Sequence, residues 1–210
     1  MTESGTDAKS AILDRIGTAL ADRPQAAPIP RDYDTTRNVA DVLALAEERI
    51  DDYKATVHRS TPEKLPELIA ARLAARGART MVAPAELPSE WLADGVTWLL
   101  DEPEKPLSVA ELDGSDGVLT GCALTIAETG TIVLDAGPES GRRMLTLVPD
   151  YHLCVIRADQ VVDAVPAAIA RLGADRPVTF ISGPSATSDI EFNRVEGVHG
   201  PRTLDVILVA

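Results

Sequence analysis

Apolar residues recur at helical spacing in the first quarter of the chain and predict helices over residues 8–21 and 39–52. The first apolar stripe consists of Ile12, Leu13, Ile16 and Leu20. The second consists of Val39, Val42, Leu43, Ala46 and Ile50, with acidic residues on the opposite side. Prolines between residues 23 and 37 predict an extended connector. We therefore expect a helical arm that packs on the main body or on a partner protein.

Short apolar runs alternate with helix signals after residue 56. Strands are predicted at residues 56–58, 80–83 and 96–99. Thr61 and Pro62 are typical of a helix start, and Gly77 is typical of a helix end. Because strands that alternate with helices pair through right-handed crossovers, this part of the chain predicts a parallel sheet.

The second half of the chain contains continuous apolar runs at residues 131–135, 145–148, 153–157, 178–182 and 204–209. Runs without alternation indicate strands that are covered on both faces. A helix is expected over residues 159–172, and Pro166 should kink it or divide it into two short pieces. The predicted fold class is α/β, with a mostly parallel sheet over residues 56–210 and an N-terminal helical arm over residues 1–55.

The net charge, the apolar runs and the cysteines of the chain exclude several functional classes of protein. The chain has 210 residues and a formal charge of −13, which argues against a nucleic-acid-binding surface. It has no apolar run of about 18 residues and no apolar signal core near Met1, so we expect a cytoplasmic protein without a membrane span. The cysteines, Cys122 and Cys154, lie in apolar stretches and form no CxxC pair. We expect both to be buried and reduced, with no iron–sulfur cluster or zinc site in this chain.

Two polar, glycine-containing loops beside apolar runs are the best candidates for a functional site. In the second loop, Ser182, Gly183, Ser185 and Thr187 follow a predicted buried strand. Hydroxyls and backbone N–H groups in such a loop could hold a phosphate or carboxylate. The alternative is a turn in which the hydroxyls only cap backbone donors. The residues leave both interpretations open.

Glu128 lies in the first loop, beside Thr129 and Gly130, which are further candidates for binding the substrate or anion. This glutamate could act as a general base or carboxylate nucleophile, or it could only accept hydrogen bonds from the turn. His199, between glycines in the stretch 197–200, could transfer a proton or only donate to a carbonyl. These two residues are the catalytic candidates.

Arg142 and Arg143 form a tight basic pair in the strand-rich half. Two neighbouring guanidinium groups could clamp a carboxylate or phosphate, or they could form surface ion pairs. Asp189, Glu191 and His199 carry metal-binding side chains, but their spacing fits no defined metal motif. We predict no metal site.

Three motifs resemble the lactate-utilization (LUD) domain family. They are Ile126-Ala127-Glu128-Thr129-Gly130-Thr131-Ile132-Val133, Val148-Pro149-Asp150-Tyr151-His152, and Ile181-Ser182-Gly183-Pro184-Ser185 continuing through Asp189-Ile190-Glu191 to Gly197-Val198-His199-Gly200-Pro201. The terminal Val206-Ile207-Leu208-Val209 also matches, and the resemblance covers roughly residues 56–210. Within the family the chain looks most like lactate-utilization protein C.

The resemblance implies a Rossmann-like sheet related to ribose-5-phosphate isomerase, glucosamine-phosphate deaminase and CoA transferases. It also implies a cluster-free subunit of an L-lactate-oxidising oxidoreductase complex, working with iron–sulfur partner subunits. No cofactor is expected in this chain itself, and a homo-oligomer is compatible with the sequence. Alternatives are a self-sufficient enzyme acting on a phosphorylated sugar or CoA ester, and a non-catalytic assembly subunit. In each case we expect the two polar loops to meet at one crevice, with His199 at its rim.

Overall fold

The computed structural model describes residues 4–22, 25, 27–173, 175–184, 186–187, 195–196 and 200–210, and describes no side chains at residues 4–7, 186–187 and 195–196. The chain forms two compact units, Met1–Asp34 and Thr35–Ala210. The first unit contains the helix α1 (Ser4–Ala19). Its predicted apolar stripe is exposed, since Ile12, Leu13, Ile16 and Leu20 each keep half or more of their surface accessible.

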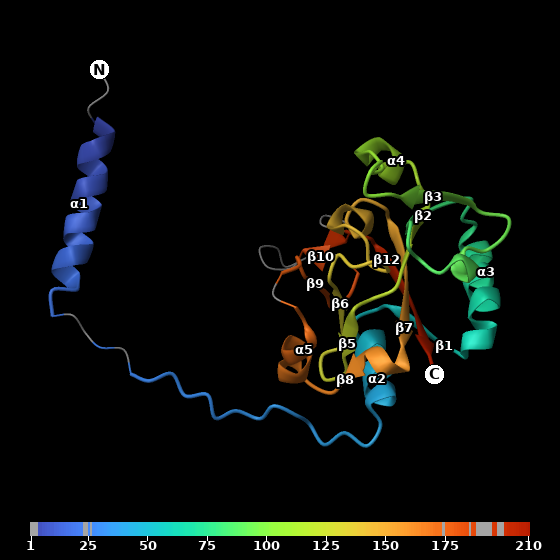
Figure 1. Cartoon of the computed structure of the whole chain (residues 1–210), viewed down its shortest axis with the longest axis horizontal. Helices are drawn as coiled ribbons and strands as arrows, with labels where there is room; N and C mark the ends of the chain where they lie inside the picture. Colours follow the sequence, from blue (N-terminus) through green and yellow to red (C-terminus); the bar gives the residue numbers. More distant parts are fainter. Residues whose placement is uncertain are drawn as a thin grey trace. The chain divides into compact units, whose positions relative to one another are not determined.

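A six-stranded sheet forms the centre of the second unit (Figure 1). Its strand order is β1-β12-β7-β4-β2-β3, and every neighbouring pair is parallel. The strands are β1 (Thr56–Ser60), β2 (Thr80–Pro84), β3 (Thr97–Asp101), β4 (Gly117–Thr120), β7 (Tyr151–Arg157) and β12 (Thr203–Val209). The central strands β7 and β12 are buried at nearly every position, which explains their unbroken apolar runs.

A smaller sheet has the order β8-β5-β6-β9. It contains β5 (Leu124–Ile126), β6 (Thr131–Leu134), β8 (Val161–Val162) and β9 (Thr179–Ile181). The strands β5, β6 and β9 pair antiparallel, and β8 pairs parallel with β5. A two-stranded ladder joins β10 (Ala186–Thr187) and β11 (Val195–Glu196).

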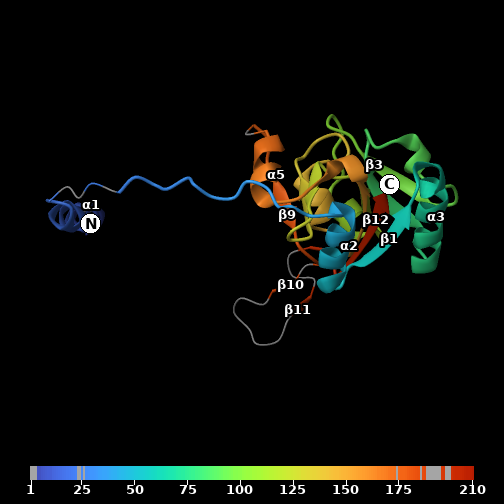
Figure 2. The ribbon, with the colours of Figure 1, turned by 90° about the horizontal axis from the view of Figure 1, so that it is seen from below.

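The two faces of the large sheet have different covers. Helix α3 (Leu65–Arg76) packs on one face, while α2 (Val42–Asp52) and the small sheet lie on the other (Figures 1 and 2). The remaining helical segments are η1 (Pro62–Lys64), η2 (Ser89–Trp91), α4 (Val109–Asp113), η3 (Arg143–Thr146), η4 (Ala158–Gln160) and α5 (Val165–Arg171). No helix among these and the other described residues is long and apolar enough to cross a bilayer.

Helix α2 belongs to the core of the second unit. Its residues Ala46 and Ile50 are completely buried in one cluster with Cys122 and Cys154. Both cysteines are buried and unpaired, as the sequence predicts. The compact unit therefore begins at Thr35 and includes α2, whereas the sequence-based division falls at residue 55.

Two predicted elements are wrong. The run at residues 145–148 is not a strand, because the chain forms η3 there. Leu145 fills an apolar cluster with Val82, Leu112 and Val118, so its burial does not require a sheet. The helix expected over residues 159–172 is reduced to α5, because Val161 and Val162 pair with β5 instead.

Pro166 lies in the first turn of α5, where proline has no helical N–H to lose. The proline therefore marks a helix start rather than a kink.

The sequence pattern did not predict β4 and β5, whose short segments are fully buried at each position.

Candidate functional site

The fold brings the two polar loops together. Strand β6 pairs with β9, so that Ile132 lies opposite Ile181. As a result the hydroxyl oxygen of Thr131 lies 2.8 Å from that of Ser182 and 2.7 Å from that of Thr129. A chain of three hydroxyl groups thus joins the start of β6 to the end of β9.

The Thr129–Gly130 turn is covered by the end of α2. Gly130 adopts φ +64°, and a Cβ atom there would lie 2.8 Å from the backbone carbon of Arg49. The Tyr53 hydroxyl donates a 2.6 Å hydrogen bond to the Gly130 carbonyl. The ring of Tyr53 also lies 3.3 Å from where a Cβ of Gly183 would be. Gly130 is therefore required for close packing.

A cavity of about 280 Å³ lies beside the second loop. Ser182, Gly183 and Pro184 line it together with residues of β9 and η3, one residue near the start of each of the strands β7 and β12, and the segment just before β12. We call it the Arg143 cavity, after the one charged side chain that lines it among the described residues. Its walls combine hydroxyl groups from Thr146 and Ser182 with apolar surface from Leu147, Phe180 and Leu204.

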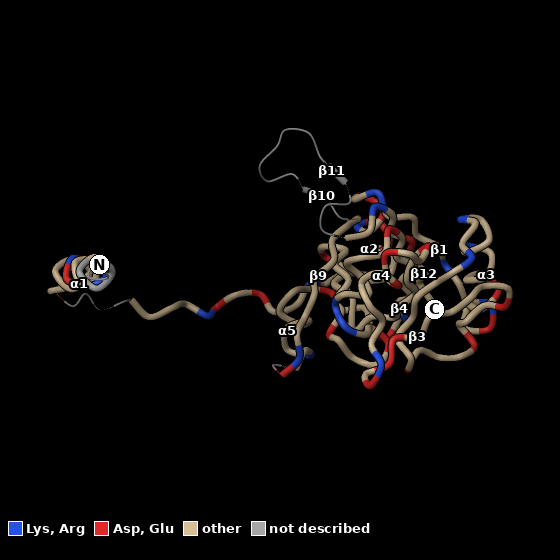
Figure 3. The backbone as a smooth tube through the Cα atoms, turned by 90° about the horizontal axis from the view of Figure 1, so that it is seen from above, with Lys and Arg blue, Asp and Glu red and all other residues tan. Residues whose placement is uncertain are grey.

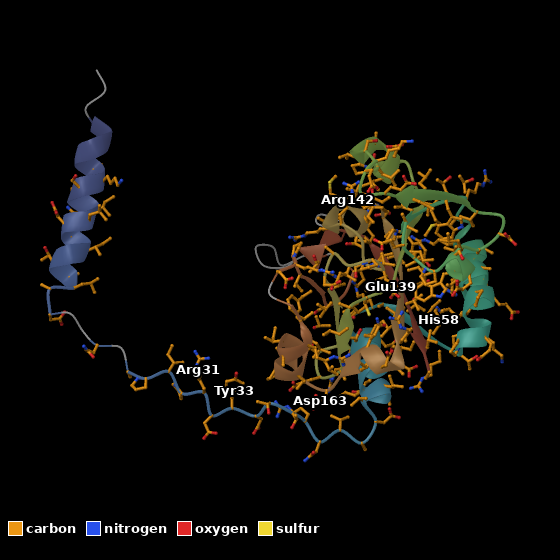
Figure 4. All side chains as sticks on the ribbon, in the orientation of Figure 1. Arg31, Tyr33, His58, Glu139, Arg142 and Asp163 are labelled. Atoms are coloured by element: carbon orange, nitrogen blue, oxygen red, sulfur yellow. The ribbon has the colours of Figure 1, made fainter. Side chains whose placement is uncertain are left out.

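The two arginines of the basic pair point to different places. Arg142, labelled in Figure 4, donates from Nε to Oδ2 of Asp101 at 2.8 Å and from Nη2 to Oδ1 at 2.9 Å. It also donates to the Leu107 carbonyl. Arg143 is exposed, and no carboxylate of the described residues forms an ion pair with it. Among the described residues, Arg143 is therefore the charged side chain of the cavity that an anion can pair with.

His152 forms part of the cavity wall from the second position of β7. Its side chain is 1% exposed, and its Nε2 lies 2.8 Å from the Thr120 hydroxyl. Burial lowers the pKa of His152 to about 4, so the imidazole is neutral at physiological pH. The sequence pattern assigns His152 no role of its own. The sequence does contain one signal for His152, a polar residue at the start of a buried strand. Such a residue needs a hydrogen-bond partner inside the fold.

Glu128, Thr129 and Gly130 do not line this cavity. The role of Thr129 and Gly130 in anion binding stays a prediction. The Glu128 carboxylate Oε1 accepts hydrogen bonds from Arg37, at 2.9 Å from Nε and 2.8 Å from Nη2. The Arg37 backbone N–H donates to the carboxylate of Asp163, and the Glu128 N–H donates to the Asp163 carbonyl at 3.1 Å. Glu128 thus fastens the segment before α2 to the turns after β5 and β8.

The remaining candidates are outside the described part of the chain. Ser185, Asp189, Glu191 and His199 are not described, and of Thr187 only the backbone is described. Their roles in anion binding or proton transfer stay predictions.

The arrangement suits a small anion that also has apolar surface. Arg143 supplies one positive charge, and no described acidic side chain lines the cavity. A guanidinium pairs with a carboxylate through two parallel hydrogen bonds. The volume and the apolar wall fit a short-chain carboxylate.

Elsewhere in the second unit acidic and basic positions are interspersed along the backbone (Figure 3).

The chain is similar to several known proteins. The family model described as LUD domain matches residues 43–209. A protein named lactate utilization protein C from Deinococcus radiodurans is 48% identical over 98% of this chain and 97% of its own length. Lactate utilization protein C 1 from Bacillus mycoides is 28% identical over 89% of this chain and 90% of its own length.

A crystal structure of a DUF162 family protein from Deinococcus radiodurans has the same fold, with a TM-score of 0.68. It is 45% identical in sequence, and the match covers 80% of this chain and 96% of that chain. The relation to the isomerase, deaminase and CoA-transferase folds stays a prediction.

Proposed function

Because this chain belongs to the LUD domain family, we propose that it acts in lactate utilization and that the Arg143 cavity binds the small carboxylate involved. Relatives named lactate utilization protein C match it over nearly its full length, which supports the general role. The observation that carries the binding proposal is the guanidinium of Arg143 at a small, partly apolar cavity.

In this proposal each feature of the cavity has one task. Arg143 pairs with the carboxylate of L-lactate or pyruvate, and the hydroxyls of Ser182 and Thr146 accept or donate hydrogen bonds at its polar end. Leu147 and Phe180 offer apolar surface to the methyl group. His152, neutral and held against Thr120, positions the cavity wall without adding charge.

The oxidation itself would be shared with other subunits. Conversion of L-lactate to pyruvate removes two electrons and two protons. We propose that iron–sulfur partner subunits accept the electrons, as the family resemblance implies. The present chain would then contribute binding and orientation of the organic acid.

The first test is genetic. We expect deletion of the gene to abolish or slow growth on L-lactate, and the wild-type gene to restore it. The Arg143→Gln variant should fail to restore growth, whereas Arg171→Gln, on the exposed side of α5, should restore it. Normal growth of the deletion strain on L-lactate would remove the proposed role.

The second test isolates binding. Titration of the purified chain with pyruvate or L-lactate should show at least ten-fold weaker binding for Arg143→Gln, because a hydrogen bond to a charged group contributes about 1.5–3 kcal/mol. Equal affinity of the wild type and Arg143→Gln would show that the Arg143 cavity does not bind the carboxylate, even if the protein acts in lactate utilization.

A further inference from the structure

The chain leaves two neighbouring strands of the large sheet toward opposite faces. After β2 it passes through Leu87 and Trp91, which pack in the cluster on the α3 face. After β4 it reaches Cys122, which packs with α2 on the other face. In α/β sheets such a reversal opens a crevice outside the carboxyl ends of the strands, and ligands bind there.

Two adjoining cavities, of about 220 and 720 Å³, occupy this position. We call them together the carboxyl-edge crevice. They share Gly137 and Pro138, and they include the last residues of three strands, Pro84, Asp101 and Arg157. None of the described residues that line the crevice also lines the Arg143 cavity.

Glu139, labelled in Figure 4, lines the crevice and is held there by hydrogen bonds. Arg157 donates from Nη1 to both carboxylate oxygens of Glu139, at 3.0 and 2.8 Å. The Glu139 carbonyl accepts from the Gly121 N–H at 2.9 Å. A Cβ atom on Gly121 would lie 2.6 Å from Oε2 of Glu139, so only glycine leaves room for the carboxylate at this strand end.

Neighbouring groups fix this arrangement. Gln160 is buried, donates to the Cys122 carbonyl at 2.6 Å and accepts from the Arg157 N–H at 2.9 Å. On the other side, Ala136 has φ +53°, a conformation that non-glycine residues adopt only when their surroundings enforce it. The polar groups of the crevice are therefore preorganised before any ligand arrives.

The charges of the crevice select the kind of ligand. Among the described residues three arginines line it, and each already faces a carboxylate: Arg157 with Glu139, Arg176 with Asp135, and Arg142 with Asp101. Glu86 and Glu102 add two further carboxylates, so five negative and three positive side chains give −2. This charge opposes phosphates, whereas carboxylates and guanidiniums together accept from and donate to neutral hydroxyl groups.

We propose that the carboxyl-edge crevice is a second ligand site and that it binds an uncharged polyhydroxylated small molecule, of the kind that a free monosaccharide represents. The Glu139 carboxylate accepts hydrogen bonds from the hydroxyls, and the remaining N–H groups of Arg157 donate to them. Pro84, Pro103 and Pro138 provide apolar surface for the C–H side of the ring. The site is independent of the Arg143 cavity and of the lactate role.

The test is isothermal titration calorimetry of the full chain with D-ribose, D-glucose and D-ribose 5-phosphate. At least one free sugar should bind saturably, and D-ribose 5-phosphate should bind at least ten-fold more weakly than D-ribose. Glu139→Gln and Gly121→Ala should each weaken sugar binding at least ten-fold. Arg143→Gln, in the other cavity, should bind the sugar like the wild type.

Several outcomes would overturn the site. They are no saturable binding of either free sugar, tighter binding of the phosphorylated sugar, or unchanged affinity in Glu139→Gln. If circular dichroism shows that Glu139→Gln and Gly121→Ala are unfolded, the exposed rim variant Arg176→Gln decides, and unchanged affinity there contradicts the proposal.

Discussion

At the scale of single residues, neighbours in the sequence have different surroundings and therefore different roles. Arg142 donates hydrogen bonds to Asp101 and to the Leu107 carbonyl, so its charge is already paired with a carboxylate within the fold. Arg143, the next residue, lines a cavity and has no ion-pair partner among the residues that the structure describes. Charge alone does not distinguish the two positions.

His152 allows a prediction about pH. Its folded-state pKa is about 4 because burial disfavours the charged form, whereas an unfolded histidine titrates near 6.5. Between these values the unfolded chain binds a proton that the folded chain does not, so the free energy of unfolding decreases as pH falls. We expect this group alone to remove about 3 kcal/mol between pH 7 and 4.

Urea unfolding at pH 7, 5.5 and 4 measures this loss. The His152→Gln variant should lack that part of the pH dependence, whatever its stability at pH 7, because the carboxylates titrate equally in both proteins. Parallel curves for the two proteins would show that His152 does not titrate as its burial requires.

At the scale of elements, the turn between β5 and β6 depends on α2. Gly130 combines φ +64° with close contact to the backbone of Arg49. Gly77, the C-cap of α3, has a similar φ of +70°, but nothing lies within 4 Å of its Cβ position. A comparison of these two glycines therefore distinguishes the cost of backbone strain from the cost of lost packing.

We expect Gly77→Ala to cost about 1 kcal/mol of unfolding free energy, because only the left-handed backbone conformation is penalised. Gly130→Ala should cost about 2–4 kcal/mol, since displacement of α2 adds to the same penalty. Chemical denaturation of both variants measures the difference. Equal losses would mean that α2 moves away from the turn without cost.

At the scale of the whole molecule, the core of the second unit accounts for its stability. Clusters on both faces of the parallel sheet, including α2, are built from residues after Thr35. The apolar residues of α1 are exposed in the first unit. A chain of residues 35–210 should therefore fold by itself in one cooperative transition.

Differential scanning calorimetry of residues 35–210 beside the full chain checks this expectation. The absence of a cooperative unfolding transition in residues 35–210 would contradict it. A truncated chain that begins after α2 should not fold, because Ala46 and Ile50 fill the same cluster as Cys154 and Ile156.

Local patterns predict those elements whose causes are local. Helix α3 follows directly after η1, which Pro62 begins, and it has an apolar stripe and ends at Gly77. All three signals act within a few residues. The strands β7 and β12 follow from unbroken apolar runs. The family resemblance also rests on residues that lie in order along the chain, and the LUD domain match agrees with it.

Long-range packing determines the rest. Leu145 is apolar, and its segment forms a helical turn rather than a strand because the Leu145 side chain packs in a cluster with Val82 and Val118 of the large sheet. Pairing of β6 with β9 places Thr131 against Ser182, and Arg37 reaches Glu128 across a long separation in sequence. Such contacts depend on which surfaces meet after folding, and the spacing of residues along the chain contains no information about that.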